Sequence, residues 1–225
     1  MLAKYRQLYP TEAIVPKFYG LPKIHKASVP LRPIVASRGS ITYQISRLLA
    51  DILAPLVGRT KHHLKNSLDL VEKLRGVTIL EDECLVSYDV TALFTSVPVN
   101  ESLEIIKQKL NEDQRLQERT ALTPAQITEI LSLCLKTTYF CYNEKFYQQV
   151  EGAAMGSPVS SVVAILFMEH LETKALPSFH STPKFWGRYV DDTLVIISRT
   201  CVQDFTEHLN DQHPAIKFTI DEEQK

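Results

Sequence analysis

The stretch FWGRYVDDTLVIIS, Phe185 to Ser198, decides the fold of this chain. Two apolar segments flank a short polar centre, a pattern typical of a β-hairpin that turns near Asp191 and Asp192. A carboxylate among apolar residues is unfavourable unless another group compensates its charge. The two adjacent aspartates therefore indicate that a partner comes from elsewhere in the chain or from a bound cation.

A third carboxylate stands at the end of another predicted strand, CLVSYDV at residues 84–90, which carries Asp89. If this strand pairs with the hairpin at 189–197, the three acids meet at one end of a sheet. Three neighbouring carboxylates cannot all stay ionised without cations. Mg²⁺ prefers such oxygen ligands, and two ions can stabilise the attacking and leaving oxygens of a phosphoryl transfer. The simpler alternative is that the two adjacent aspartates only form a turn or a helix cap.

The remaining pattern predicts an α+β protein. Prolines punctuate the first 40 residues and favour extended pieces and turns there. A hairpin is predicted around Asn143-Glu144 and a last strand at 215–220. Helices are predicted at 41–56 with Ser40 as its cap, at 67–75, at 101–110, from the capping box at Thr123 to about 136, from Ser157-Pro158 to 172, and at 202–210.

Composition narrows the class of protein. Of the 225 residues 44% are hydrophobic, which is ordinary for a globular domain, and no apolar run reaches membrane-spanning length. The start of the chain lacks the apolar stretch of a signal peptide, and the four cysteines are scattered. We therefore expect an intracellular protein without a membrane association. The adjacent pair His62-His63 reads as a solvated polar loop rather than a zinc site.

Charge is distributed unevenly along the chain. Residues 1–75 contain 13 Lys and Arg against 4 Asp and Glu, a balance of +9, whereas residues 76–225 contain 12 against 22, a balance of −10. This asymmetry predicts that the first part contacts phosphate and that the second holds cations. Two independently solvated faces would give the same count.

Five ordered segments resemble the motifs of reverse transcriptases. YVDD resembles motif C, SYDVTALFTSVP resembles motif A, and EGAAMGSPVSSVVAILFMEHLE resembles motif B. PKFYGLPKIHK with PLRPIVASRGSITYQISRLLADILAPL resembles the fingers motifs of the Penelope-like retroelements, whose polymerase is akin to that of telomerase, and HPAIKFTIDEE resembles their motif D. The resemblance covers about Pro16 to Glu223 and implies a right-hand polymerase with an antiparallel palm sheet packed on helices.

The resemblance implies a role for each matching residue. Asp89, Asp191 and Asp192 would be the catalytic acids and, with the carbonyl of Val90, the ligands of two Mg²⁺ ions, which Mn²⁺ could replace. Phe94 falls where the family places an aromatic steric gate against the ribose 2′-hydroxyl; an ordinary core aromatic is the alternative. The implied nucleotide-binding residues are Lys23, Lys26, Arg32, Phe94, Gly156 and Ser157, with Lys217 as a weaker candidate for the general acid.

The expected function is therefore that of an RNA-directed DNA polymerase core of a retroelement, acting on an RNA template, a DNA primer and dNTPs. The expected compartment is the nucleus. Residues 1–80 would form the fingers region and 81–225 the palm with inserted elements. The chain stops where the family continues into its thumb, so we expect fingers and palm only, as a fragment or a decayed copy, and its activity alone stays an open question. Two alternatives stay open: a non-catalytic nucleic-acid-binding remnant, and a viral RNA-dependent RNA polymerase palm, which Phe94 argues against.

Overall fold

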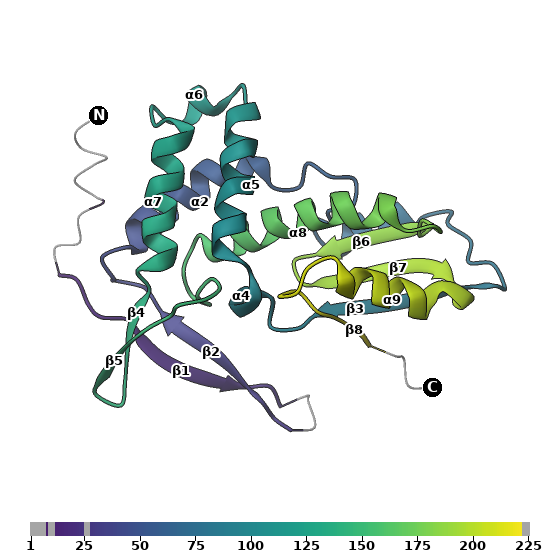
Figure 1. Cartoon of the computed structure of the whole chain (residues 1–225), viewed down its shortest axis with the longest axis horizontal. Helices are drawn as coiled ribbons and strands as arrows, with labels where there is room; N and C mark the ends of the chain where they lie inside the picture. The colour runs from purple at the N-terminus through teal and green to yellow at the C-terminus, as the bar shows by residue number, and fades with distance from the viewer. Residues whose placement is uncertain (1–7, 9–11, 25–27, 222–225) are drawn as a thin grey trace.

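The structure is a computed structural model that describes residue 8, residues 12–24 and residues 28–221. Within these ranges the chain forms two four-stranded sheets and a set of helices around one continuous apolar core (Figure 1). No helix of the described ranges is both long enough and apolar enough to cross a membrane. The architecture is α+β, as the sequence predicts.

The first sheet contains the predicted hairpin and the strand with Asp89. Its order is β6-β7-β3-β8 and all neighbours are antiparallel. These strands span β6 Phe185–Tyr189, β7 Asp192–Ser198, β3 Glu83–Val90 and β8 Phe218–Asp221. The predicted pairing of the 84–90 strand with the hairpin is thereby confirmed.

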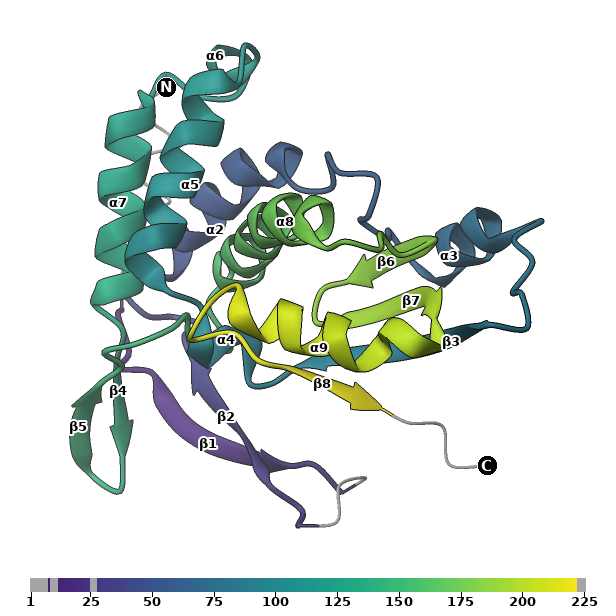
Figure 2. The ribbon, with the colours of Figure 1, turned by 45° about the vertical axis from the view of Figure 1, so that its right-hand side comes forward.

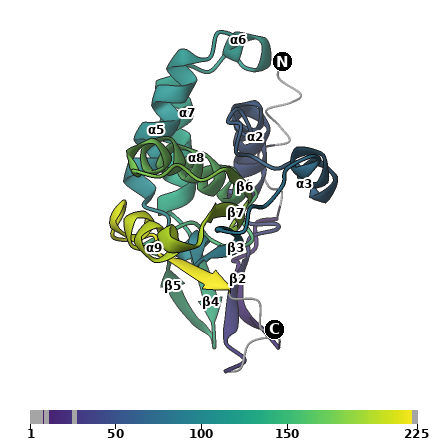
Figure 3. The ribbon, with the colours of Figure 1, turned by 90° about the vertical axis from the view of Figure 1, so that its right-hand side faces the viewer.

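One face of this sheet is covered by two helices, α8 (Ser160–Ser178) and α9 (Val202–Asp211) (Figure 3). Tyr88 of β3 contacts Phe205 of α9 edge-on, and the two ring centroids are 6.2 Å apart. Because side chains alternate along a strand, the neighbouring Asp89 lies on the opposite face. The helices therefore bury the apolar face and leave the face with the acid open.

The second sheet has the order β2-β1-β4-β5 and joins segments that are far apart in sequence (Figure 2). β1 is paired antiparallel with β2 and parallel with β4, the latter through Lys17 and Cys141. The turn between β4 and β5 has positive φ at both Asn143 and Glu144, as the predicted tight hairpin requires. The strands span β1 Lys17–Pro22, β2 Leu31–Ala36, β4 Tyr139–Tyr142 and β5 Lys145–Gln148.

Among the other helices, α4 and α5 pack against α8, and α7 packs against α5 and α2. α5 and α7 lie side by side and are linked by α6 at their far end (Figures 1 and 2). Their bounds are α2 Tyr43–Leu53, η1 Ala54–Leu56, α3 Ser67–Leu74, α4 Leu93–Ser96, α5 Val99–Glu112, α6 Leu116–Arg119, α7 Pro124–Lys136 and η2 Arg199–Cys201. The predicted capping box at Thr123 is present at the start of α7.

The helix predicted after Ser157-Pro158 is present as α8, which starts at Ser160. Two other local predictions were wrong. Ser40 does not cap α2, which begins after Thr42; the Ser40 hydroxyl is instead buried with no partner among the described residues. His62 and His63 are not in a solvated loop: His63 forms a parallel bridge with Arg188 at the edge of the first sheet, and both rings are half-buried.

Candidate active site

A pocket of about 560 Å³ opens between the two sheets at the end of β3. Residues from five separate segments line it, although they span more than 160 positions of sequence. Nine of the predicted site residues are among them: Lys23, Arg32, Asp89, Val90, Phe94, Gly156, Ser157, Asp191 and Asp192. Lys26 lies outside the described residues, and Lys217 is not among the residues that line the pocket.

The register of β3 and β7 brings the acids together. The last pair of the β3–β7 ladder is Tyr88 with Thr193, so the next positions along the two strands are Asp89 and Asp192. Asp191 lies in the two-residue turn between β6 and β7, which Tyr189 and Asp192 close as the last cross-strand pair. The carboxylates therefore reach one pocket from two neighbouring strands and the turn between them.

The β6–β7 turn itself has an unfavourable backbone. Val190, its first central residue, has φ of +58°, a conformation that a β-branched side chain rarely adopts. Backbone conformations of this kind cost about 1–3 kcal/mol and persist only where the surrounding structure imposes them. Something in the fold must therefore hold the turn that carries Asp191.

Phe94 is placed by a tight bend after β3. Ala92 has φ of +50°, and α4 follows directly, so the Phe94 ring comes back to the pocket that Asp89 lines. The ring also packs partly against the apolar core, and the Phe94 carbonyl accepts a hydrogen bond of 2.7 Å from the amide of Ala153. The position of the Phe94 ring in the pocket suits a steric gate. Its contacts with the apolar core also fit the alternative, an ordinary core aromatic.

Gly156 makes a close backbone contact with β2. The nucleotide-binding role that the resemblance to reverse transcriptases implies for Gly156, space beside a nascent base pair, stays a prediction. In the structure a Cβ at Gly156 would lie 2.2 Å from the carbonyl oxygen of Val35, and its φ is +121°. The amide of Val35 donates to the Met155 carbonyl at 2.9 Å, and the Ser37 hydroxyl donates to the Gly156 carbonyl. The loop before α8 is thus attached to β2, the strand that carries Arg32.

Lys217 lies beside the end of β3 but its amine points elsewhere. Its carbonyl accepts a hydrogen bond of 2.8 Å from the amide of Thr91, two residues after Asp89. Its ammonium donates to the carbonyl of Asn210, near the end of α9, at 2.8 Å. The general-acid role of Lys217 stays a prediction that requires the side chain to change rotamer.

The donor set of the pocket suits a hard divalent cation. Carboxylate oxygens and a backbone carbonyl are the ligands that Mg²⁺ takes, and Mg²⁺ usually keeps several positions for water and phosphate. Among the residues that the structure describes, no group of three or more His, Cys, Asp or Glu side chains is placed to hold a metal ion. The fit to a divalent cation rests on the chemistry of the oxygen donors that line the pocket.

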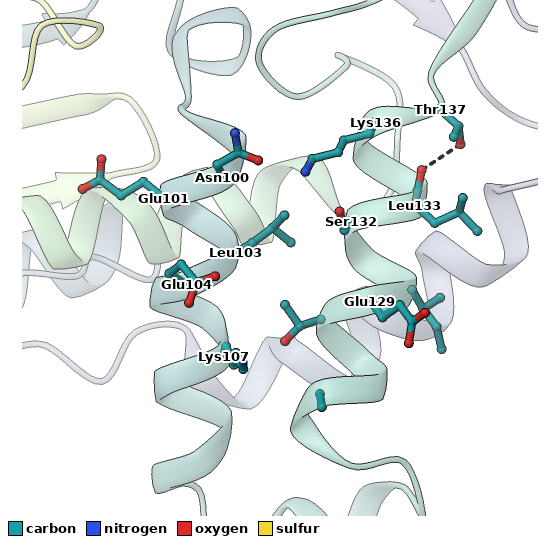
Figure 4. A pocket seen from close by; sticks show the side chains of 13 residues that line it. Asn100, Glu101, Leu103, Glu104, Lys107, Glu129, Ser132, Leu133, Lys136 and Thr137 are labelled. Atoms are coloured by element: carbon teal, nitrogen blue, oxygen red, sulfur yellow. Dashed lines mark hydrogen bonds between the residues drawn. The ribbon is translucent and has the colours of Figure 1, made fainter.

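A larger hollow, of about 1010 Å³, lies outside this site between α5 and α7 (Figure 4). Its walls carry charges of both signs, such as Glu104 and Lys107 on α5 and Glu129 and Lys136 on α7. It lacks the convergence of acids and phosphate-binding cations that the pocket at β3 has, so we do not assign the chemistry to it.

Comparison with known proteins identifies the family. The family model described as reverse transcriptase (RNA-dependent DNA polymerase) matches residues 24–218. The chain belongs to the reverse transcriptase family. No curated protein matches its sequence.

Solved polymerases share the fold at low sequence identity. A telomerase from Candida tropicalis in complex with a TWJ fragment of telomeric RNA is 14% identical, with a TM-score of 0.62 over 99% of this chain and 44% of that one. The telomerase from Candida albicans in the same kind of complex is 12% identical, with a TM-score of 0.64 over 96% of this chain and 44% of that one. The RNA-dependent RNA polymerase of BmCPV at the elongation state is 14% identical, with a TM-score of 0.61 over 98% of this chain and 22% of that one. The chain thus has the right-hand polymerase fold and spans less than half the length of these telomerase chains.

Proposed function

We propose that this chain is the catalytic core of an RNA-directed DNA polymerase, which transfers a nucleotidyl group from a dNTP to a primer 3′-hydroxyl on an RNA template. The observation that carries the proposal is the composition of the pocket at the end of β3. Three acids, an arginine, a lysine and a phenylalanine from separate segments line this one pocket. Membership of the reverse transcriptase family supports the same reaction.

The residues divide the chemistry between two sides of the pocket. Asp89, Asp191 and Asp192, with the carbonyl of Val90, would hold two Mg²⁺ ions. Such ions, when bound, stabilise the attacking and the leaving oxygen of an in-line displacement. Arg32 on β2 would bind the triphosphate oxygens, for which a planar guanidinium is well suited, and Lys23 would add a point charge.

Phe94 would select the sugar of the incoming nucleotide. Its ring lines the pocket next to Asp89, where a ribose 2′-hydroxyl would collide with it. This position favours a DNA polymerase over the alternative of an RNA-dependent RNA polymerase, although viral enzymes of that class share the fold. The complete set of three acids likewise disfavours a remnant that only binds nucleic acid.

Branch and organisation follow from the fingers motifs. We assign the chain to the Penelope-like branch on the segments Pro16–Lys26 and Pro30–Leu56, and telomerase structures among the neighbours support that assignment. We assign residues 1–80 to the fingers and 81–225 to the palm, with the β4–β5 hairpin inserted into the β1–β2 sheet. RNA template, DNA primer and dNTP would be the partners, and the nucleus the compartment.

Primer extension tests the proposal. The chain, alone and in a version extended at its C-terminus by a polymerase thumb, is given a DNA primer on an RNA template with dNTPs and Mg²⁺. We expect template-directed extension that Asp191→Asn abolishes, because this change removes a ligand charge without changing shape. Extension that persists in Asp191→Asn, or none from any version while RNA still binds, would contradict the proposal.

A further inference from the structure

A buried ion pair lies directly behind the catalytic turn. The Arg188 side chain of β6 is 0% exposed and the Glu172 side chain of α8 is 2% exposed. The Arg188 Nε donates to Glu172 Oε1 at 2.5 Å, and its Nη2 donates to Oε2 at 3.2 Å. The indole Nε1 of Trp186 donates to the same Oε1 at 2.9 Å. Both carboxylate oxygens are therefore engaged, and the pair has a fixed orientation.

Stability of the fold does not explain this pair. Taking two charges out of water is costly, and a well-packed apolar pair of similar volume is often as stable or more stable. The surrounding positions of α8, such as Phe167, Met168 and Leu171, show that this region accepts apolar side chains. A buried ion pair in such a place indicates a requirement for geometry rather than for stability.

The third contact of the guanidinium shows what that geometry serves. Arg188 Nη1 donates to the carbonyl oxygen of Val190 at 2.9 Å. Val190 is the residue with φ of +58°, and Asp191 follows it directly. A planar guanidinium can contact both Glu172 oxygens and the Val190 carbonyl at once, whereas an ammonium offers only one point of charge.

The Arg188 backbone is also held from both sides. Its amide donates to the His62 carbonyl and its carbonyl accepts from the Leu64 amide, both at 2.8 Å. On its other side Arg188 is paired with Thr193 of β7. The arginine is thus anchored in the sheet, and its side chain can transmit the position of α8 to the turn.

We propose that Arg188, oriented by Glu172, is a positioning residue that holds the strained Val190 turn and thereby places the Asp191 carboxylate for divalent-cation binding. This inference rests on the proposed function, since it assumes that Asp191 is a metal ligand. Arg188 and Glu172 do not line the pocket, and they would act on metal binding only through the β6–β7 turn.

The test measures Mn²⁺ binding to the chain by electron paramagnetic resonance, together with thermal unfolding and the fluorescence of Trp186, the single tryptophan. Arg188→Lys keeps the charge and Glu172→Gln keeps the shape. We expect each to raise the Mn²⁺ dissociation constant by about five- to thirtyfold, the range for residues coupled in one network. The Trp186 emission should shift in Glu172→Gln, because the acceptor of its N–H changes.

The matched control is Glu169→Gln, one turn earlier on α8. Glu169 is equally buried, but its carboxylate accepts from the Gly58 amide at 2.6 Å and does not contact the turn. Mn²⁺ binding should stay at the wild-type level in this variant. A loss equal to that in Glu172→Gln would show that any buried acid on α8 matters, and would overturn the positioning role.

A rescue variant separates positioning from folding. Val190→Gly removes the penalty of positive φ, so the turn should depend less on the arginine. In the Val190→Gly background, Arg188→Lys should weaken Mn²⁺ binding by less than about twofold, because the strained turn that Arg188 holds in place is no longer present. An undiminished effect would show that Arg188 acts through general stability, and would contradict the proposal.

Two further variants distinguish this inference from the function on which it rests. If Asp89→Asn and Asp191→Asn leave Mn²⁺ binding unchanged, the metal site itself is wrong and both proposals fail. If these two variants abolish binding while Arg188→Lys and Glu172→Gln bind as the wild type does, only the positioning role fails.

Discussion

Tyr88 in β3 lies opposite Thr193 in β7, and this single pair sets the geometry of the pocket. Tyr88 faces the helices: its ring packs edge-on against Phe205 of α9, and its hydroxyl is 2.9 Å from that of Thr206. The Tyr88 ring also stacks near Trp186 of β6 on the same face of the sheet. Because strand side chains alternate, the next residues, Asp89 and Asp192, lie on the open face. The buried tyrosine therefore fixes the register that brings the acids together.

Replacing Phe94 by valine should change sugar selection. A smaller side chain leaves room for a 2′-hydroxyl, so we expect ribonucleotide incorporation to rise by about ten- to a hundredfold. Deoxynucleotide incorporation should fall much less. The measurement is single-nucleotide extension with matched rNTP and dNTP, made on the version that extends primers. Unfolding of the variant without any change in sugar preference would show that Phe94 is core packing.

Replacing Gly156 by alanine should detach the loop before α8 from β2. The new Cβ would meet the Val35 carbonyl and would sit at φ of +121°. We expect a loss of about 2–4 kcal/mol in the free energy of unfolding, measured in urea. Gly76→Ala is the control, since φ there is +79° but nothing lies within 4 Å of the added Cβ. An equal loss in both variants would show that the contact with β2 contributes nothing.

Arg32 should contribute to nucleotide affinity through its planar guanidinium group. It lines the pocket from β2, whereas the acids come from β3 and the β6–β7 hairpin. Arg32→Lys keeps one charge but cannot make two parallel hydrogen bonds, so the KM for dNTP should rise by about tenfold or more. The kinetic assay is repeated at several salt concentrations, and Arg38→Lys, which does not line the pocket, serves as the control. Equal KM values in all three proteins would exclude Arg32 from the triphosphate site.

Acidic pH should destabilise the edge of the sheet beside Arg188. Burial lowers the pKa of His62 and of His63 below the ordinary 6.5, and for His63 the positive charge of Arg188 adds to the effect. The unfolded chain then binds more protons than the folded one, so stability falls as pH drops below about 6.5. Urea unfolding between pH 7.5 and 5.5 measures this, about one unit on each side of an unperturbed histidine. A double His62→Gln, His63→Gln variant should show a flatter pH dependence, and an unchanged slope would rule out these two histidines as its source.

Much of the fold is predictable because its caps, turns and strands depend on residues that are neighbours in the sequence. The capping box at Thr123, the turn at Asn143-Glu144 and the two halves of the catalytic hairpin all appear where the pattern places them. The convergence of the pocket is not local: it depends on pairing between strands a hundred residues apart. Five motifs in the order of a known family supply that information.

The buried network behind the turn could not be predicted in the same way. Glu169 and Glu172 follow the apolar run at 162–168 of α8, and nothing in the sequence of this helix says which partner each will meet. Arg188 reads as an ordinary strand residue before the aspartates. Only tertiary packing shows that Glu172 and Arg188 meet, and that a backbone carbonyl of the turn completes the contact.

We expect the acids of β3 and of the β6–β7 turn to bind the catalytic cations. Anomalous scattering from Mn²⁺ can locate these ions in crystals of the protein with an RNA template, a chain-terminated DNA primer and the matching dNTP. Mn²⁺ peaks should lie in contact with the carboxylates of Asp89 and Asp191 and with the carbonyl of Val90. A bound dNTP whose Mn²⁺ ions contact none of these groups would show that the acids do not bind the catalytic cations.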